Sequence, residues 1–154
     1  MHITFYDTRV TEDYLTTLVV ERKIQYPIER YDSPNLIAEF LNDVTGLNVK
    51  GEEHCYMVAL NVKNRILGIF LVSKGTVNQS VLGTREVFMR ALLVGASHII
   101  LCHNHPSGDC FPSRDDINLT KRFKEAGELL GIPLTDHVVV GGDNYFSFAE
   151  KEML

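Results

Sequence analysis

The sequence is poor in cysteine and lacks the features that mark an exported or membrane-bound chain. Its three cysteines, Cys55, Cys102 and Cys110, are odd in number and form no CxxC pair, which argues against a disulfide framework and against a zinc ribbon. No apolar run approaches the roughly 18 residues of a membrane span. The first residues do not combine a basic start with an apolar stretch, so no secretory signal is expected. We expect a reduced, globular, cytoplasmic protein.

An excess of basic residues is also missing. Lys and Arg total 15, Asp and Glu total 20, and the formal net charge is −5. This balance does not favour nonspecific binding to nucleic acid, which needs a basic surface. The chain has 154 residues, 45% of them hydrophobic, without repeats or a Pro/Gly/Ser-rich linker. That is enough for one domain with a full core.

Residues 1–50 are interpreted as an accessory segment of short strands and one helix, with a boundary near 46–51. The elements expected in it are a strand at 3–7, a strand at 24–31, and a helix that Ser33 caps and Gly46 ends. The second strand would lie at a sheet edge because Pro27 has no N–H for a ladder. Pro34 suits the first helical position.

Residues 51–154 are predicted to form the main domain. Its expected elements are strands at 55–61 and 66–73 joined by a turn at Asn64, a brief pairing at 80–82, a helix capped by Thr84 and running to Val94, a strand at 99–102, a helix at 113–130, a strand at 138–140 and its hairpin partner at 145–148. The apolar run at 99–102 is typical of a strand buried on both faces. Hairpins with helices between them predict an α/β (α+β) layered domain with a partly antiparallel sheet.

The strongest chemical signal is the segment 103–116, H-N-H-P-S-G-D-C-F-P-S-R-D-D, which follows the buried strand directly. His103 and His105 lie two residues apart, so both side chains point the same way from an extended chain. Ser113 begins an S-x-x-D capping pattern that places Asp116 in the first turn of the next helix, where its carboxylate can turn back toward the histidines. Two histidines and one aspartate with an open position are the ligands of a catalytic zinc site. Zinc lowers the pKa of its bound water to about 7 and polarises a carbonyl.

A zinc hydrolase also needs a base that accepts the proton of the attacking water. Glu52 and Glu53 are the candidates because they precede the first strand of the main domain, although the residues alone favour an exposed carboxylate at a strand end. Cys110 is expected to be a free thiol, with zinc ligation as the alternative. Asp136 and His137 precede a strand and are considered as a supporting pair behind the metal, with a surface or core role as the default.

This motif and its surroundings resemble the RadC family of the JAB/MPN superfamily of metalloproteins. The family's pattern of H-x-H, seven residues and S-x-x-D corresponds to His103, His105, Ser113 and Asp116. Five segments resemble RadC in the same order: T-R-E-V-F-M-R-A-L at 84–92, I-I-L-C-H-N-H-P-S-G-D at 99–109, P-S-R-D-D-I at 112–117, D-H-V-V-V-G at 136–141 and Y-F-S-F-A-E at 145–150. The resemblance covers about residues 52–154.

The resemblance implies a cytidine-deaminase-like JAB/MPN sandwich with a mixed, curved sheet flanked by helices, and a zinc-dependent (JAMM-type) peptidase or isopeptidase activity. The residue roles that it implies are zinc ligation by His103, His105 and Asp116, activation of water by Glu53 with Glu52 as the fallback, and a hydrogen bond from Ser113 to the developing oxyanion. RadC proteins often carry an N-terminal helix-hairpin-helix region that binds DNA. Residues 1–50 lack its paired helices and glycine hairpins, so DNA binding is not expected.

The sequence supports three functional hypotheses. The leading one is a Zn2+-dependent hydrolase that cleaves a peptide or isopeptide bond in an unknown peptide or protein substrate. The first alternative is a DNA-repair-associated, metal-dependent nuclease or DNA-processing factor; the literal string H-N-H does not support it, because the HNH nuclease name describes dispersed residues of a different fold. The second alternative is a noncatalytic interaction module, metal-stabilised or metal-free. Residues 1–50 are interpreted as a dimerisation arm or a substrate-specificity element. The substrate and the oligomeric state, a homodimer included, stay open.

Overall fold

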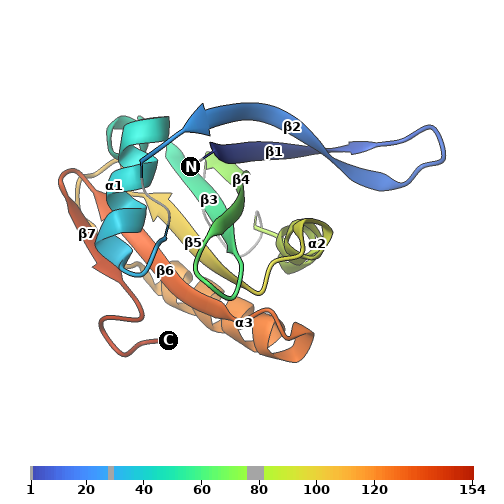
Figure 1. The fold of residues 1–154 in the computed structure, drawn as a ribbon. Coiled ribbons are helices and arrows are strands. Elements are labelled where there is room, and N and C mark those ends of the chain that lie inside the picture. Colours follow the sequence, from blue (N-terminus) through green and yellow to red (C-terminus); the bar gives the residue numbers. More distant parts are fainter. Residues whose placement is uncertain (1, 28–29, 76–81) are drawn as a thin grey trace.

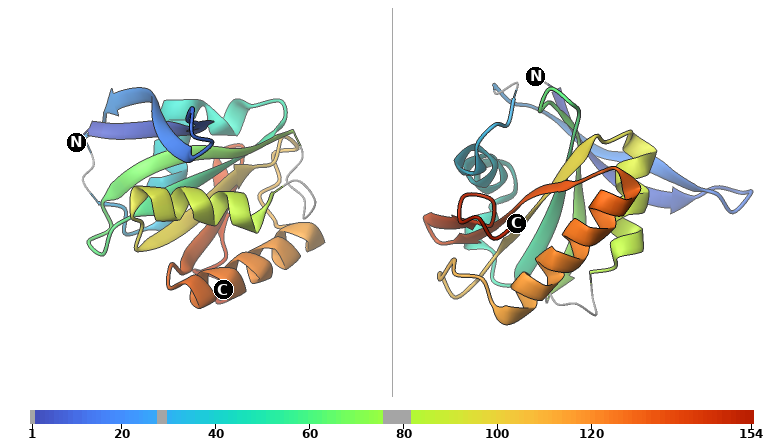
Figure 2. Two further views of the ribbon diagram at one scale, coloured as in Figure 1. Left: turned by 90° about the vertical axis from the view of Figure 1, so that its right-hand side faces the viewer. Right: turned by 90° about the horizontal axis from the view of Figure 1, so that it is seen from below.

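The structure is a computed structural model that describes residues 2–27, 30–75 and 82–154. Within these residues the chain forms three layers, with one sheet between helix α1 on one face and helices α2 and α3 on the other (Figures 1 and 2). The strands are β1 (His2–Val10), β2 (Thr16–Gln25), β3 (Glu53–Leu60), β4 (Ile66–Gly75), β5 (His98–Asn104), β6 (Leu134–Gly141) and β7 (Asn144–Ser147). The helices are α1 (Pro34–Thr45), the short 3-10 helix η1 (Leu47–Val49), α2 (Thr84–Val94) and α3 (Arg114–Leu130). The predicted α/β layers with a sheet flanked by helices are confirmed.

The strands of the described residues form a mixed sheet in the order β2-β1-β4-β3-β5-β6-β7. The pairs β1–β4 and β5–β6 are parallel, and the other neighbours are antiparallel. Strand β5 therefore lies between β3 and β6, well inside the sheet. This position explains its continuous apolar sequence, because both of its faces are covered.

The two faces of the sheet build two separate cores. Met57 of β3 and Leu101 of β5 pack with α2 and α3, whereas Val58 and Ile100 pack on the face that α1 covers. Successive side chains of a strand alternate between faces. His103, two residues beyond Leu101, is therefore directed to the face of α3 and is completely buried.

Helices α1 and α3 begin and end as the sequence predicts. The Ser33 side chain accepts a hydrogen bond from the backbone of the first turn of α1, Pro34 occupies the first position, and Gly46 ends the helix in the left-handed conformation with φ 62°. Ser113 caps α3, and Gly131 ends it with φ 69°. In the described part of the chain no helix is long and apolar enough to cross a membrane.

The start of helix α2 differs from the prediction by one residue. The N-cap is Gly83 rather than Thr84, which is the first helical residue, and no side chain bonds the cap. A Cβ placed on Gly83 would lie 1.9 Å from Oε2 of Glu86. The Glu86 carboxylate thus folds back over the helix start, where the helix dipole favours a negative charge, and it occupies the space that a capping side chain would need.

The N-terminal strands differ most from the prediction. β1 is longer than the expected strand at 3–7. The strand expected at 24–31 is misplaced, because β2 runs from Thr16 to Gln25 and the described residues 26, 27, 30 and 31 belong to no strand; residues 28–29 lie outside the described part of the chain. The hairpin turn between β1 and β2 has Tyr14 in the left-handed conformation, with φ 62°. The turn contains no glycine or Asn-Gly signal, so nothing in its sequence reveals it. β2 is an edge strand, and the hairpin extends past helix α2 (Figure 1).

Two further predictions are not tested by the described residues. The pairing expected at 80–82 falls mostly outside the described residues; Leu82 itself is buried and belongs to no strand. The division of the chain at residue 50 stays a prediction. β1 pairs with β4 through Phe5 and Ile69, so the sheet is continuous across that point.

Candidate metal centre

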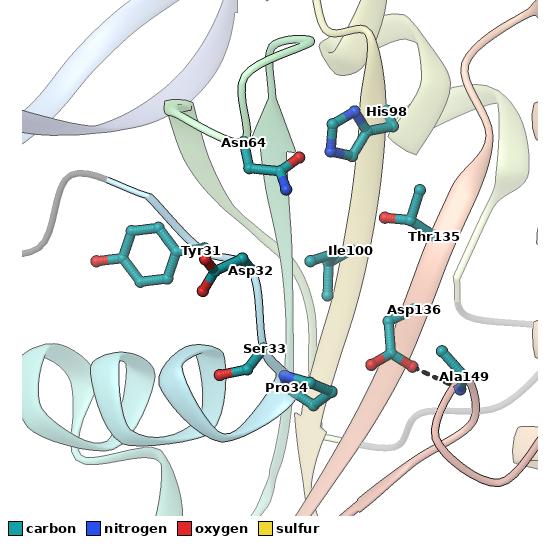
Figure 3. Close-up of a pocket in the computed structure, with 10 residues that line it drawn as sticks. All are labelled: Tyr31, Asp32, Ser33, Pro34, Asn64, His98, Ile100, Thr135, Asp136 and Ala149. Carbon is teal, nitrogen blue, oxygen red and sulfur yellow. Dashed lines mark hydrogen bonds between the residues drawn. The ribbon is translucent and has the colours of Figure 1, made fainter.

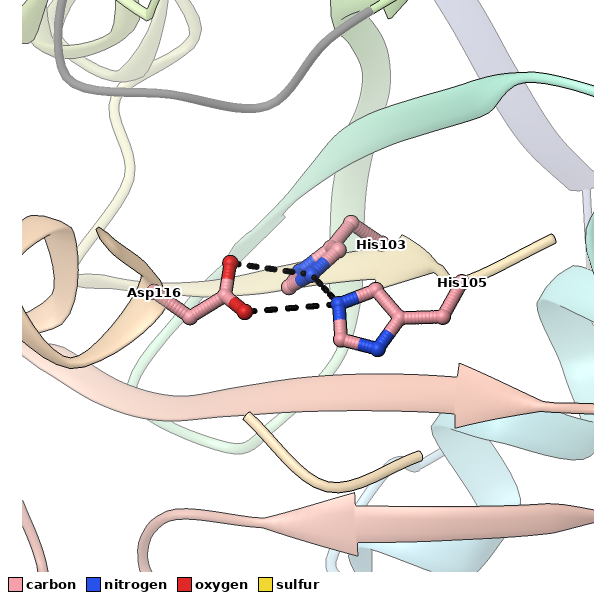
Figure 4. Close-up of side chains that lie close together, drawn as sticks. All are labelled: His103, His105 and Asp116. Atoms are coloured by element: carbon pink, nitrogen blue, oxygen red, sulfur yellow. Dashed lines mark hydrogen bonds and ion pairs between the residues drawn. The ribbon is translucent and has the colours of Figure 1, made fainter. Parts of the chain in front are cut away.

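His103, His105 and Asp116 converge at the junction of strand β5 and helix α3 (Figure 4). The Nε2 atoms of the two histidines are 3.1 Å apart. Asp116 Oδ1 lies 3.2 Å from Nε2 of His103, and Oδ2 lies 3.3 Å from Nε2 of His105. His103 and Asp116 are buried, and the side chain of His105 is 13% exposed, so the group opens to solvent beside His105.

The strand and the loop after it place both histidines. β5 continues through Asn104, so His103 lies within the strand, and the His105 N–H extends the pairing by donating to the Val140 carbonyl oxygen at 2.8 Å. Gly108 turns the loop back with φ 82°. The Asp109 carbonyl oxygen then lies 2.8 Å from Nδ1 of His105. Nδ1–H donates there, which leaves the Nε2 lone pair of His105 directed at the cluster.

This loop also rests directly on β6. A Cβ on Gly141 would lie 2.5 Å from the backbone nitrogen of Cys110 and 2.7 Å from the carbonyl oxygen of Gly108. Both contacts are with backbone atoms, which cannot move aside as a flexible side chain could. The loop that carries His105 therefore needs a glycine at position 141.

The start of α3 places Asp116 through a capping box, as the S-x-x-D pattern predicts. The Asp116 N–H donates to Ser113 Oγ at 3.1 Å, and the Ser113 N–H donates to Asp116 Oδ2 at 2.7 Å. The Ser113 hydroxyl also donates to Oδ2 at 2.7 Å. Capping and orientation of the carboxylate are thus performed by the same contacts.

The electrostatics of the cluster keep its carboxylate charged. Burial by itself would raise the pKa of Asp116, but the hydrogen bonds with His103 and His105 outweigh burial, so the pKa lies below its usual range. The hydrogen bond to Asp116 is the main cause that raises the pKa of His105 above its usual value. The negative charge of Glu53 acts in the same direction, so this carboxylate is close enough to be felt at the site.

The donor set fits a tetrahedral zinc ion. Zn–N bonds of 2.0–2.1 Å place two tetrahedral ligands roughly 3.3–3.4 Å apart, and the three contacts of the cluster measure 3.1, 3.2 and 3.3 Å. In the absence of metal, protons on the Nε2 atoms make the hydrogen bonds to Asp116; once both rings are neutral, two lone pairs and a carboxylate repel one another unless a metal ion lies among them. His103, His105 and Asp116 would hold that ion, with the exposed side of the cluster left for water or substrate.

Of the two candidate bases, Glu53 lies on the sheet face that carries the cluster. Glu53 is the first residue of β3 and, by alternation, shares the face of Cys55, which is the cross-strand partner of His103. Glu52 is exposed and forms an ion pair with Lys74 at 3.2 Å. The role of Glu53 as base stays a prediction, and the fallback to Glu52 loses its geometric support.

The residues behind the cluster were largely missed by the sequence reasoning. The supporting pair Asp136–His137 is half right, because Asp136 accepts from the backbone N–H of His137 and not from its ring. The His137 ring is buried, its Nε2 lies 2.8 Å from Nδ1 of His103, and burial lowers its pKa. Its Nδ1 lies 2.6 Å from the hydroxyl of Thr120 in α3. No local motif signals this contact, because it depends on the parallel pairing of β5 with β6.

Asn104, the residue between the two histidines, holds the segment that carries the candidate base. Its Oδ1 accepts from the His54 N–H at 2.8 Å, and its Nδ2 donates to the carbonyl oxygens of Lys50 and Glu52 at 3.3 and 3.2 Å. Asn104 is buried on the opposite side of β5 from the ligands. It therefore joins the ligand strand to the start of β3.

The cysteines do not belong to the cluster. Cys55 and Cys102 are fully buried, and burial raises the pKa of both thiols. Cys110 is partly exposed and free, as expected. Among the described residues, the only group of three or more metal-binding side chains is the one that the sequence predicts.

A separate cavity of about 340 Å³ lies at the other end of β5 (Figure 3). It is lined by Tyr31, Asp32, Ser33, Pro34, Asn64, His98, Ile100, Thr135, Asp136 and Ala149. His98 begins β5, whereas His103 and His105 lie at its far end. The cavity is thus separate from the group formed by His103, His105 and Asp116.

Comparison with known proteins agrees with this geometry. A family model described as a RadC-like JAB domain matches residues 31–153, which include every residue of the cluster. The chain belongs to the RadC-like JAB domain family. Similar proteins carry the name UPF0758 protein: that of Clostridium novyi is 45% identical over 117 residues, 73% of this chain and 51% of the relative. Those of Clostridium beijerinckii and Geotalea uraniireducens are 43% and 42% identical, over 79% and 82% of this chain and 52% and 55% of theirs.

The chain spans about half the length of the curated relatives it matches. The RadC-like JAB domain is also consistent with the observed mixed sheet and flanking helices. Family membership supports a metal-dependent hydrolase as the general class of function, and His103, His105 and Asp116 offer three ligand atoms close enough together to hold a metal ion.

Proposed function

We propose that this RadC-like JAB domain is a zinc-dependent hydrolase that cleaves a peptide or isopeptide bond in a peptide or protein substrate. The observation that carries the proposal is the convergence of His103, His105 and Asp116 with contacts of 3.1–3.3 Å, close to the spacing of zinc ligands. The partial exposure of His105 leaves one side of the cluster accessible to a substrate. When bound, zinc supplies a water molecule with a pKa of about 7 and polarises the carbonyl under attack.

Glu53 would serve as the general base. It lies on the ligand face at the start of β3, and Asn104 holds the backbone on either side of it. Its carboxylate would take the proton of the attacking water and pass it to the nitrogen of the leaving amine. Proton transfer by a positioned side chain contributes roughly 10²–10⁴ in rate.

Ser113 would donate a hydrogen bond to the oxyanion that develops on the attacked carbonyl. In this structure its hydroxyl proton is directed to Asp116 Oδ2. The hydroxyl must therefore rotate away from the carboxylate when substrate arrives. Since the Ser113 N–H also bonds Oδ2, Asp116 stays oriented while the hydroxyl turns.

The test asks whether cleavage depends on the metal and on Glu53, with a variant of the neighbouring Glu52 as the control. Zinc-loaded protein is assayed on a panel of fluorogenic peptides and isopeptide-linked substrates, before and after chelation and after zinc is restored. Glu53→Gln should keep stoichiometric zinc and lose at least about 10²-fold in rate. Glu52→Gln makes the same chemical change one residue away, on an exposed side chain, and should retain wild-type activity.

Two results would contradict the proposal. One is stoichiometric zinc with no chelator-sensitive cleavage of any substrate in the panel. The other is cleavage that Glu53→Gln and Glu52→Gln leave equally fast, which would remove Glu53 from the reaction.

A further inference from the structure

A continuous chain of hydrogen bonds leads from helix α3 to the buried metal-binding histidine. The Thr120 hydroxyl lies 2.6 Å from the Asp116 carbonyl oxygen and 2.6 Å from Nδ1 of His137. Nε2 of His137 lies 2.8 Å from Nδ1 of His103. Nε2 of His103 then faces His105 and Asp116. Thr120, His137 and His103 are all buried, so water does not supply alternative partners.

The first hydrogen bond, from the Thr120 hydroxyl to the Asp116 carbonyl oxygen, fixes which group donates in each of the bonds that follow. A carbonyl oxygen only accepts, and a threonine hydroxyl carries one proton. Because Thr120 donates that proton to the Asp116 carbonyl, its oxygen must accept from Nδ1–H of His137. The neutral His137 ring then has a lone pair on Nε2, and this lone pair accepts Nδ1–H of His103.

We infer that Thr120 and His137 are positioning residues that hold His103 in the tautomer whose Nε2 lone pair points at the metal. The inference rests on the metal site of the proposed function. His105 reaches the same tautomer more simply, through the Asp109 carbonyl oxygen. His103 lies inside the sheet, and its Nδ1 faces the ring of His137 instead of a carbonyl oxygen. A histidine ring can donate or accept, so it is Thr120, the partner of His137, that decides which of the two rings donates.

The packing around His137 suits this role. Its ring stacks on Phe148, with ring centroids 5.1 Å apart and an interplanar angle of 9°. Phe148 is itself completely buried. The stack leaves the ring little freedom to turn, so the two ring nitrogens keep their separate partners.

The first test measures zinc affinity by competition with a chromophoric chelator. Thr120→Val keeps the shape of the side chain and removes the hydroxyl, and it should weaken zinc binding about 10–100-fold, as loss of a partner behind a ligand does. Thr120→Ser restores the hydroxyl and should restore the affinity. Thr45→Val is the matched control, because the Thr45 hydroxyl makes the same bond to the carbonyl four residues earlier, at 2.6 Å, in helix α1; it should bind zinc like the wild type.

The second test reads the protons directly in the wild-type protein. Two-bond proton–nitrogen spectra of the histidine rings in isotope-labelled, zinc-loaded protein report which ring nitrogen carries hydrogen. We expect His137 protonated on Nδ1 only and His103 protonated on Nδ1. A His137 ring protonated on Nε2 would overturn the inference, as would Thr120→Val protein that is folded and binds zinc as tightly as Thr120→Ser.

These readouts separate the inference from the proposed function. If the affinities and tautomers are as expected and no substrate is cleaved, only the hydrolase proposal fails. If cleavage depends on zinc and Glu53 while Thr120→Val leaves the zinc affinity unchanged, or the wild-type His137 ring is protonated on Nε2, only the positioning role fails.

Discussion

Replacing Ser113 separates the structural role of its side chain from its chemical one. Ser113→Ala removes the acceptor of the Asp116 N–H and the donor to Asp116 Oδ2, but the backbone bond from Ser113 N–H to Oδ2 remains. Loss of an N-cap side chain costs about 0.5–2 kcal/mol. We expect the free energy of unfolding of metal-free protein to fall by about 1–2 kcal/mol. That corresponds to a melting temperature lowered by roughly 2–4 °C per kcal/mol in a domain of this size.

Urea denaturation of three proteins checks this value. Ser113→Asn should recover most of the lost stability, because asparagine is as good an N-cap as serine. Equal stability of Ser113→Ala and wild type would refute the reasoning, because the capping box would then contribute nothing. So would a Ser113→Asn protein as unstable as Ser113→Ala.

The same substitution has a separate kinetic consequence. At saturating zinc, kcat of Ser113→Ala should fall by about 10²–10³, the usual effect of losing one oxyanion donor. Ser113→Thr keeps both the cap and a hydroxyl, and it should retain most of the rate. A kcat of Ser113→Ala equal to that of Ser113→Thr would limit Ser113 to capping.

Further predictions concern the surroundings of the cluster. Gly141→Ala should displace the loop that carries His105 and weaken zinc binding. Gly51→Ala is the control and should not, because an added Cβ there meets no atom within 4 Å. Equal zinc affinities of the two variants in a chelator competition would contradict the close packing of Gly141 against this loop. Asn104→Ala leaves a buried backbone N–H without its acceptor and should lower the free energy of unfolding by about 1–3 kcal/mol in urea, and an unchanged midpoint would argue against the bond. A thiol reagent should modify Cys110 rapidly and the two buried cysteines only after denaturation. Rapid modification of all three thiols in the folded protein would contradict the burial of Cys55 and Cys102.

The metal cluster was predictable because its signals are local. His103 ends up on the same side of the extended chain as His105 whatever strand β5 pairs with, because they lie two residues apart. The S-x-x-D pattern orients Asp116, three residues after Ser113. The helices were predictable for the same reason, since Ser33, Gly46 and similar caps act within one turn. Only the cap at Thr84 was displaced, by a single residue.

What the sequence could not reveal depends on contacts between distant segments. The role of His137 depends on the register of β5 with β6, in which Leu101 pairs with His137. Strand β2 exists because it pairs along its whole length with β1, although most of its side chains are exposed. The preference for Glu53 over Glu52 came from the family resemblance, and its geometric reason appears only with the pairing of β3 and β5, which puts Glu53 on the sheet face of Cys55 and His103.

The most direct test of the account is X-ray absorption at the zinc edge on protein loaded with one equivalent of zinc. We predict a single shell of nitrogen and oxygen ligands near 2.0–2.1 Å, with a histidine signature that His103→Ala or His105→Ala reduces. A sulfur shell near 2.3 Å, or a spectrum that neither substitution changes, would place the ion elsewhere and contradict the central claim.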